Sequence, residues 1–483
     1  MQKTTLIFAF ILSIFGSVGS QTTGWHNGGG NWQKNGFADV AGPTGDSILW
    51  QVNSPGIFGT PLFIEGNYLV TMRFLSPTNA PVACFNLTTG NLLWSADVTN
   101  GAGRSLPVGL RDQKLFVVRL TESQNDSLFA LDVATGARLW ASNVLVAPYI
   151  SETAVFDSIG NLYINGNQKT YKINPANGQM IWQTTTVPMA SGSGEMALNS
   201  SANTGYTLEQ SGGISFLWAI DLATGLKKYR HVVSDLQPGG NMPQSALMVG
   251  QNGIIYVQLT EDNVAAFSDN GSKFTPLWQT KISGNASFSL MCSGPDGSVY
   301  APAGGRIIRL DPLTGDTLNL SAVITQGGFF SPRISAANNN MIYVTNGENY
   351  VYAFDAALNM LWSDFFPNTN TSGMCIAPNG LAAVAGQNRV RVYKPAALSS
   401  TDEPVTTAAK LYPNPAGSFI TLSGKGLPIG VPCAFVNVSG QVVKTSVTQG
   451  ASTVFDLSDM APGLYFLKVE GVVEPFKMIK TDR

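Results

Sequence analysis

Short runs of apolar residues, each four or five residues long and bounded by Asn, Asp or Gly, recur along most of the chain. Examples are Lys114–Val118, Ile254–Val257 and Met341–Val344. Runs of this length that are rich in β-branched and aromatic residues predict strands rather than helices. The pattern therefore predicts an all-β chain made of many short antiparallel strands.

A turn sequence of the form Asp/Asn-x-x-Thr/Asn-Gly, followed by a Trp, separates many of these runs. It occurs at 86–94, 132–140 and 174–182, and the acid or amide precedes the Trp by eight residues each time. The Asp or Asn side chain accepts hydrogen bonds from nearby backbone N–H groups and the Gly takes a positive φ, so the sequence closes a hairpin. We expect the Trp to fill the wedge between neighbouring sheets and assign it no binding role.

Divergent copies of this turn extend the series. The copy at 221–229 ends in Tyr, and the copy at 311–319 lacks the aromatic residue. Successive anchor positions are 41 to 49 residues apart, and they are Trp50, Trp94, Trp140, Trp182, Tyr229, Trp278, Asn319 and Trp362. A period in the forties indicates one four-stranded propeller blade per repeat.

The two ends of the series are incomplete in a complementary way. Residues 373–394 contain three strand-like runs without the turn or the Trp, whereas 47–52 is a Trp strand with no blade before it. Joining them would complete a blade and close the ring, which leaves no exposed sheet edge. We expect an eight-bladed β-propeller; a seven-bladed ring is the alternative if the aberrant repeat around Asp311 is merged or skipped.

This repeat resembles the pyrroloquinoline-quinone-type (quinoprotein-type) propeller repeat of quinoprotein alcohol dehydrogenases and outer-membrane assembly lipoproteins. The resemblance covers roughly residues 25–395 and includes the opening Trp25-His-Asn-Gly with Gly42-Pro43. Such a repeat indicates the fold and leaves the activity open.

Both ends of the chain carry signals for export. Lys3, an apolar stretch over 6–15 and small residues before Gln21 predict a cleavable signal peptide at 1–20. We divide the rest into four parts: a lead-in at 21–45, the propeller at 46–395, a Pro/Ser/Thr-rich linker at 396–407 and a C-terminal domain at 408–483.

Alternating runs in the C-terminal domain predict a small immunoglobulin-like β-sandwich. Its ordered motifs resemble the type A C-terminal sorting domain of the type IX secretion system. The motif residues are Tyr412, Pro413, Asn414, Pro415, Gly440, Asp456, Gly463, Tyr465, Lys477 and Lys480. The resemblance implies passage across the outer membrane through the type IX machinery, removal of the domain by a sortase-like peptidase, and a final place on the cell surface or outside the cell.

Charge and cysteine content exclude several partners and cofactors. The chain has 28 Lys and Arg against 30 Asp and Glu, and its basic residues form no cluster. This argues against a nucleic-acid partner. No segment of the mature chain has the ~18 apolar residues of a membrane helix. The four isolated cysteines are expected to be buried free thiols rather than metal, haem or redox ligands, and they are Cys84, Cys292, Cys375 and Cys433.

Groups for catalysis are few. The quinone-dependent dehydrogenases that the repeat resembles use a vicinal disulfide, a bound Ca²⁺ and an Asp base, and this chain has no adjacent Cys pair and no calcium-loop motif. Only His26 and His231 could serve as histidine bases, and neither has an obvious nucleophile partner. We therefore predict no catalytic, metal or cofactor-binding residues and no cofactor. A quinone-dependent dehydrogenase and a carboxylate-based carbohydrate-active enzyme stay as alternatives.

A binding role fits better. Loops leading into the innermost strands converge at the mouth of a propeller and form a common ligand site. Aromatic residues there could stack on a sugar or a peptide while polar ones donate hydrogen bonds, and the candidates are Arg104, Tyr149, Glu195, Gln244, Phe288, Phe330 and Arg333. The sequence thus predicts an exported binding or scaffold module for a surface glycan or protein.

Overall fold

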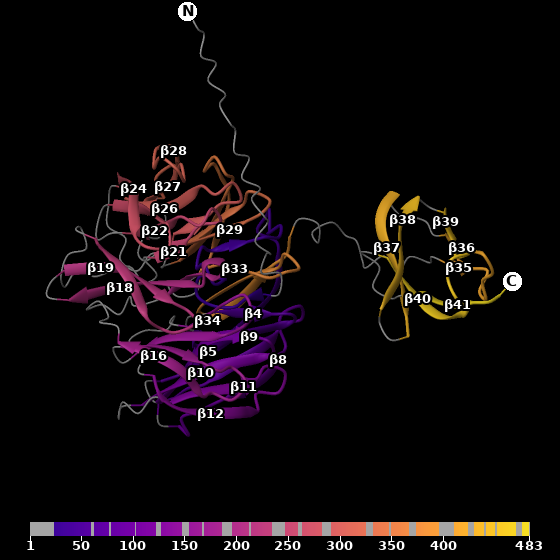
Figure 1. Cartoon of the computed structure of the whole chain (residues 1–483), viewed down its shortest axis with the longest axis horizontal. Helices are drawn as coiled ribbons and strands as arrows, with labels where there is room; N and C mark the ends of the chain where they lie inside the picture. Colours follow the sequence, from indigo (N-terminus) through magenta and orange to yellow (C-terminus); the bar gives the residue numbers. More distant parts are fainter. Residues whose placement is uncertain are drawn as a thin grey trace, which may run out of the picture. The chain divides into compact units, whose positions relative to one another are not determined.

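The fold was examined in a computed structural model, whose chain forms two compact units, 1–397 and 398–483 (Figure 1). It describes residues 24–58, 62–76, 79–101, 103–121, 127–146, 154–166, 169–185, 196–211, 214–233, 247–258, 263–282, 291–324, 332–346, 349–366, 373–395, 410–423, 429–438, 441–449, 452–469 and 476–482. The predicted signal peptide lies outside these ranges. Within them, no helix is long and apolar enough to span a membrane.

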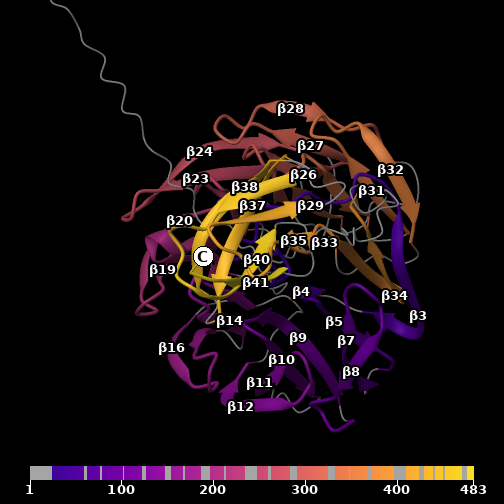
Figure 2. The same cartoon turned by 90° about the vertical axis from the view of Figure 1, so that its right-hand side faces the viewer.

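The first unit is a β-propeller whose antiparallel sheets follow one another in chain order around a common centre (Figure 2). Within each sheet, or blade, the first strand is innermost and the last outermost. The blades up to the midpoint of the ring are β4 (Phe63–Glu65), β5 (Tyr68–Phe74), β7 (Val82–Asn86) and β8 (Leu92–Ala96); β9 (Gly103–Arg111), β10 (Lys114–Thr121), β11 (Ser127–Asp132) and β12 (Arg138–Leu145); β13 (Ala154–Phe156), β14 (Leu162–Gly166), β15 (Lys169–Ile173) and β16 (Met180–Thr185); and β17 (Ala197–Asn199), β18 (Thr204–Ser211), β19 (Ile214–Asp221) and β20 (Lys227–Val232).

The following blades are β21 (Leu247–Val249), β22 (Ile255–Gln258), β23 (Asn263–Asp269) and β24 (Phe274–Lys281); β25 (Cys292–Ser293), β26 (Val299–Ala303), β27 (Arg306–Leu310) and β28 (Thr317–Leu320); and β29 (Arg333–Ala337), β30 (Ile342–Thr345), β31 (Tyr350–Phe354) and β32 (Met360–Phe365). Three two-residue strands flank them: β1 (Gly24–Trp25), β2 (Phe37–Ala38) and β6 (Asn79–Ala80). In the described part of the chain the only helix is the 3₁₀ turn η1 (Ser200–Ala202). The all-β prediction is confirmed.

The ring closes with strands from both ends of the propeller. β33 (Cys375–Ile376) and β34 (Ala382–Tyr393) are joined by β3 (Ile48–Phe58), which pairs antiparallel with β34 from Ile48 opposite Tyr393 onwards. The predicted pairing of 47–52 with 373–394 is therefore present. Because β3, an early strand, completes the last sheet, the edge of β34 that faces away from β33 is paired.

The Trp of one blade docks on the turn of the next. The indole N–H of Trp94 donates to the Val133 carbonyl at 2.8 Å, and the same ring packs against Gly136, whose φ is +73°. A Cβ at Gly136 would lie 2.7 Å from the ring, so the turn requires glycine there. Four further pairs repeat this arrangement: Trp50 with Leu87, Trp140 with Pro175, Trp182 with Leu222 and Trp278 with Pro312. The predicted packing role of these Trp residues is confirmed.

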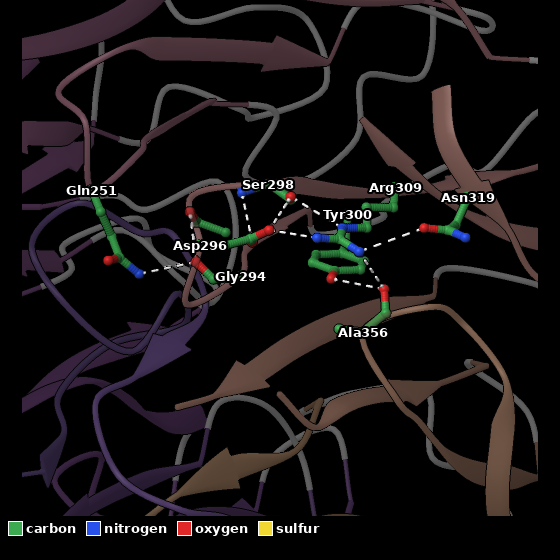
Figure 3. Close-up of polar contacts among 9 residues, drawn as sticks. Gln251, Gly294, Asp296, Ser298, Tyr300, Arg309, Asn319 and Ala356 are labelled. Atoms are coloured by element: carbon green, nitrogen blue, oxygen red, sulfur yellow. Dashed lines mark hydrogen bonds and ion pairs between the residues drawn. The ribbon is translucent and has the colours of Figure 1, made fainter. Parts of the chain in front are cut away.

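Two divergent repeats use different contacts for the same purpose. Where Tyr229 replaces Trp, its hydroxyl and that of Tyr206 both bond to the Asp269 carboxylate of the next blade. Where Asn319 replaces Trp, Arg309 on β27 reaches across the junction and donates to the Ala356 carbonyl at 3.0 Å (Figure 3). Polar contacts thus join both junctions that lack Trp, and at the first of them Tyr229 also packs edge to face on Phe274 of the next blade, with ring centroids 5.2 Å apart.

Arg309 is itself held in place within its blade. It forms an ion pair with Asp296 and donates to the Ser298 hydroxyl at 3.0 Å (Figure 3). Tyr300 donates to the same Ala356 carbonyl at 3.3 Å. The Ala356 carbonyl has the same place in its turn as the carbonyls that accept an indole N–H at other junctions. Here it accepts hydrogen bonds from the Arg309 guanidinium and the Tyr300 hydroxyl.

The second unit consists of two antiparallel sheets. One contains β35 (Lys410–Tyr412), β36 (Phe419–Ser423) and β39 (Ser452–Asp456), and the other contains β37 (Ile429–Asn437), β38 (Val442–Gln449), β40 (Gly463–Val469) and β41 (Phe476–Lys480). Phe435 from one sheet and Phe455 from the other meet edge to face with ring centroids 5.3 Å apart. A single apolar core therefore lies between the two sheets.

All four cysteines are buried free thiols, as predicted. Burial raises the pKa of Cys84 to about 12 and also raises those of Cys292 and Cys433. Thiols that are this hard to ionise act as packing groups rather than nucleophiles.

Candidate functional site

The segment before the first blade lies along the innermost strands of the ring. Gly24 and Trp25 pair with Glu65 and Ile64 of β4. The next residue, His26, accepts the N–H of Leu110 on β9 at 3.1 Å. The lead-in thus passes directly from one blade to the inner strand of the next.

The same contact then recurs around the ring. A backbone carbonyl of the lead-in accepts an N–H from an innermost strand, and the pairs are Trp32 with Leu198, Gln33 with Val249, Asn35 with Ser293, and Gly36 with Ala336. β2 then pairs in parallel with β29. Innermost strands of a propeller present an unpaired edge to the axis, and buried N–H groups there need an acceptor. The lead-in supplies it in blade after blade.

The first turn of the lead-in is buried and electrostatically constrained. His26 Nδ1 lies 2.6 Å from the Leu110 carbonyl oxygen; since a carbonyl can only accept, Nδ1 carries the proton. Burial lowers the pKa of His26 to about 4, so the ring is neutral. Glu65 accepts the backbone N–H groups of Asp112 and Gln113 at 2.8 and 2.9 Å, and burial raises its pKa.

On β9, the residue that contacts the lead-in and the predicted ligand-site residue Arg104 lie near opposite ends of the strand. Leu110, which contacts the lead-in, is near the end of β9, whereas Arg104 is near its start. Six residues of extended strand separate the two positions by about 20 Å. The backbone of the lead-in therefore lies at the Leu110 end of β9.

The structure describes two of the seven predicted mouth residues. Arg104 is exposed, and its guanidinium lies 4.9 Å from the centroid of the Phe74 ring. Arg333 begins β29 but is only 4% exposed, so it faces the interior rather than an open mouth. The other five lie outside the described residues, and they are Tyr149, Glu195, Gln244, Phe288 and Phe330.

Arg333 lines a small cavity beside the lead-in, with a volume of about 10 Å³. Lys34 and Trp25 of the lead-in form part of the opposite wall, and Lys34 is 3% exposed. A cavity of this size holds about one water molecule. Sequence reasoning missed Lys34, because only the path of the lead-in brings it beside Arg333.

The sorting-motif residues come together in the second unit. The Asn414 side chain donates to the Lys477 carbonyl at 2.8 Å and accepts the Ile479 N–H at 2.9 Å. Gly463 pairs with Lys480 across β40 and β41. The beginning and the end of the motif series therefore lie against each other, while Gly440 lies outside the described residues.

The Trp-docked blades and the closing strand define a β-propeller of the PQQ-type repeat, and the second unit is a separate export module. Residues 38–208 match the family model described as outer membrane protein assembly factor BamB. Residues 410–479 match the model of the secretion system C-terminal sorting domain. The chain thus carries a BamB-like repeat domain and a type IX sorting domain, and it is exported across the outer membrane to the cell surface or the extracellular space. The type IX machinery is accordingly one of its partners. None of the curated protein sequences matches this chain.

Solved structures share the propeller fold at low sequence identity. BamB from Moraxella catarrhalis is 14% identical with a TM-score of 0.52, over 72% of this chain and 99% of that one. Quinohemoprotein alcohol dehydrogenase from Comamonas testosteroni is 14% identical with a TM-score of 0.58, over 82% and 83% of the two chains. The computationally designed Ika8 protein is 13% identical with a TM-score of 0.53, over 72% and 99%. These likenesses concern the fold, which hosts assembly and redox proteins alike.

Proposed function

We propose that this protein is a binding or scaffold module displayed on the cell surface or released from it. The observation that carries the proposal is the sorting domain at 410–479, which delivers the propeller outside the cell. The proposed ligand is a glycan or a protein that approaches the ring from the end opposite the lead-in, where Arg104 is exposed. The lead-in backbone on the other end supports this choice of face.

We also propose the finer points of the architecture. The ring has eight blades when the closing sheet of β33, β34 and β3 counts as one, and the second unit is an immunoglobulin-like sandwich. A sortase-like peptidase removes that unit after passage through the outer membrane. The propeller spans 46–395, and 396–407 is the linker in which it is released.

The full chain, probed on arrays of surface glycans and surface proteins, tests the binding role. We expect at least one class of ligand to bind, and Arg104→Ala to weaken that binding while Arg138→Ala, an exposed arginine on an outermost strand, leaves it unchanged. Silence on both arrays contradicts the proposal.

Delivery is tested separately in a host with the type IX machinery. Deletion of 408–483 should leave the propeller in the periplasm, detected by cell fractionation and by its protection from external protease. Unchanged surface delivery would contradict the sorting role.

A further inference from the structure

A polar groove of about 720 Å³ opens between the blade β9–β12 and the blade β13–β16. One wall is β12, with Asn143 and Val144, and the other is the facing side of β15 and β16, with Lys169 and Gln183. The turn at 177–179 also lines the groove. The volume is within the range of about 300–1,000 Å³ typical of small-molecule sites.

Primary amides dominate the exposed side chains of this groove. Asn143 is exposed, and its side chain makes no hydrogen bond to any described residue. Gln183 accepts a hydrogen bond from the Lys169 ammonium through Oε1 at 3.1 Å, and the NH₂ group of Gln183 can still donate. Gln179 accepts a long bond of 3.4 Å from Asn177 and likewise keeps its own donors. Each amide can therefore both donate to and accept from a hydroxyl group.

Three amides at these positions distinguish this junction from the two junctions next to it. Asn143, Gln179 and Gln183 are the third residue after one Trp, the residue after the turn Gly, and the residue after the next Trp. Counting the same positions at the preceding and following junctions gives mainly small, apolar or charged side chains, and these are Asp97, Ala137 and Ala141, then Thr185, Leu226 and Arg230. The repeat itself therefore does not require three amides here.

We propose that this groove binds a neutral oligosaccharide, at a site of its own that is separate from the ring end where Arg104 is exposed. Hydroxyl-rich sugars require paired donors and acceptors, which the three amides supply. No carboxylate is among the described residues of the lining, and Lys169 is its one cation. Met180, whose side chain is 45% exposed at the rim, offers apolar contact for the C–H face of a sugar ring.

Titration calorimetry of the full chain with neutral oligosaccharides of glucose, mannose, xylose and N-acetylglucosamine tests the proposal. We expect at least one to bind, and the double substitution Asn143→Ala with Gln183→Ala to weaken it at least tenfold. Gln179→Ala should weaken it severalfold. Asn91→Ala, at the same turn position in the blade β4–β8, is the matched control and should change nothing.

Each contrary result overturns the groove site in a distinguishable way. Binding of none of the four sugars overturns it, and if surface proteins still bind to the chain, the wider binding function stands. Sugar binding that the double substitution leaves unchanged, with an unchanged melting temperature, overturns the location. Equal weakening by Asn91→Ala would also overturn it, because the effect would then not belong to the groove.

Discussion

The Tyr343 hydroxyl donates a 2.7 Å hydrogen bond to the carbonyl of Pro43, 300 residues earlier in the chain. Tyrosines at the same blade position, Tyr256 and Tyr300, donate instead to a carbonyl in the turn of the next blade, at Pro312 and Ala356. The closing blade lacks that turn. The lead-in thus provides, at the last junction, the acceptor that a repeat turn provides elsewhere.

Crowding at this contact makes a coupled pair of substitutions informative. A Cβ at Gly42 would lie 2.3 Å from the Tyr343 hydroxyl, and Gly42 also exchanges two hydrogen bonds with Asn339. We expect Gly42→Ala to lower the free energy of unfolding by about 2 kcal/mol and Tyr343→Phe to lower it by about 1 kcal/mol. Without the hydroxyl the nearest atom to the new methyl group is the ring carbon Cζ at 3.0 Å instead of the oxygen at 2.3 Å, so the double variant should lose less than the sum. Urea unfolding of the four proteins measures the coupling, and strict additivity would contradict the contact.

The docking turns allow a comparison of two glycines with the same backbone conformation. Gly136 and Gly66 both have positive φ, but a Cβ at Gly136 would meet the Trp94 ring at 2.7 Å while a Cβ at Gly66 has nothing within 4 Å. Gly66→Ala should cost about 1 kcal/mol for the left-handed conformation alone. Gly136→Ala should cost about 3 kcal/mol, because the indole must also move. Equal shifts in the urea midpoint would show that the Trp–Gly contact contributes little.

The repeat could be predicted from the sequence because the turn residues and the Trp of each copy lie at fixed distances from one another along the chain. Asp132, Gly136 and Trp140 are visible as one motif, and each carries a side-chain or conformational requirement. The closure of the ring followed from two incomplete repeats. Sequence patterns also placed the sorting motif, whose residues pair along neighbouring strands.

The lead-in and the interior of the ring could not be predicted in the same way. The lead-in contacts the inner strands through its backbone carbonyls, which every residue has, so no residue type marks the path. Arg333 was predicted as a ligand-site residue from its place at the start of a strand, and nothing in the sequence indicates that it is buried and lines a cavity together with lead-in residues. Arg309 makes the contact that a Trp makes at other junctions, but it lies on β27 and not on β28, where the Trp position is occupied by Asn319. The repeat pattern therefore does not point to Arg309.

Arg309 should be the main polar support of its junction. Arg309→Ala removes the Asp296 ion pair and the bonds to Ser298 and Ala356, and we expect it to cost about 2–3 kcal/mol since a guanidinium carries several of these bonds at once. Arg309→Lys should recover only part of this loss, because an ammonium cannot reproduce the planar fork.

Hydrogen exchange measures where the Arg309 effect falls. Faster exchange in Arg309→Ala should be confined to the turns around Asp296 and Ala356. Arg138→Ala, which removes an exposed arginine lying 6.0 Å from the Phe129 ring centroid, is the control and should change stability by less than about 0.5 kcal/mol. Exchange that is unaltered at Ala356 in the Arg309 variant would show that this junction depends on other contacts.

Buried His26 should make the lead-in sensitive to acid. Its pKa is about 4 in the folded protein against 6.5 for an ordinary histidine, so between these values the unfolded chain binds the extra proton. The free energy of unfolding therefore falls as the pH drops from 6.5 to 4, by up to about 3 kcal/mol from this group. Glu65, whose pKa is raised, contributes with the opposite sign, so the comparison must be made against a variant that keeps Glu65.

His26→Asn is that variant, because its amide can still donate to the Leu110 carbonyl but does not titrate. We expect the wild-type protein to lose stability relative to His26→Asn as the pH falls from 7 to 4, with little change in the difference above pH 7. Urea unfolding at half-unit pH steps gives both curves. A difference that stays constant across the range would mean that His26 binds its proton equally well in the folded and the unfolded chain, and that burial does not lower its pKa.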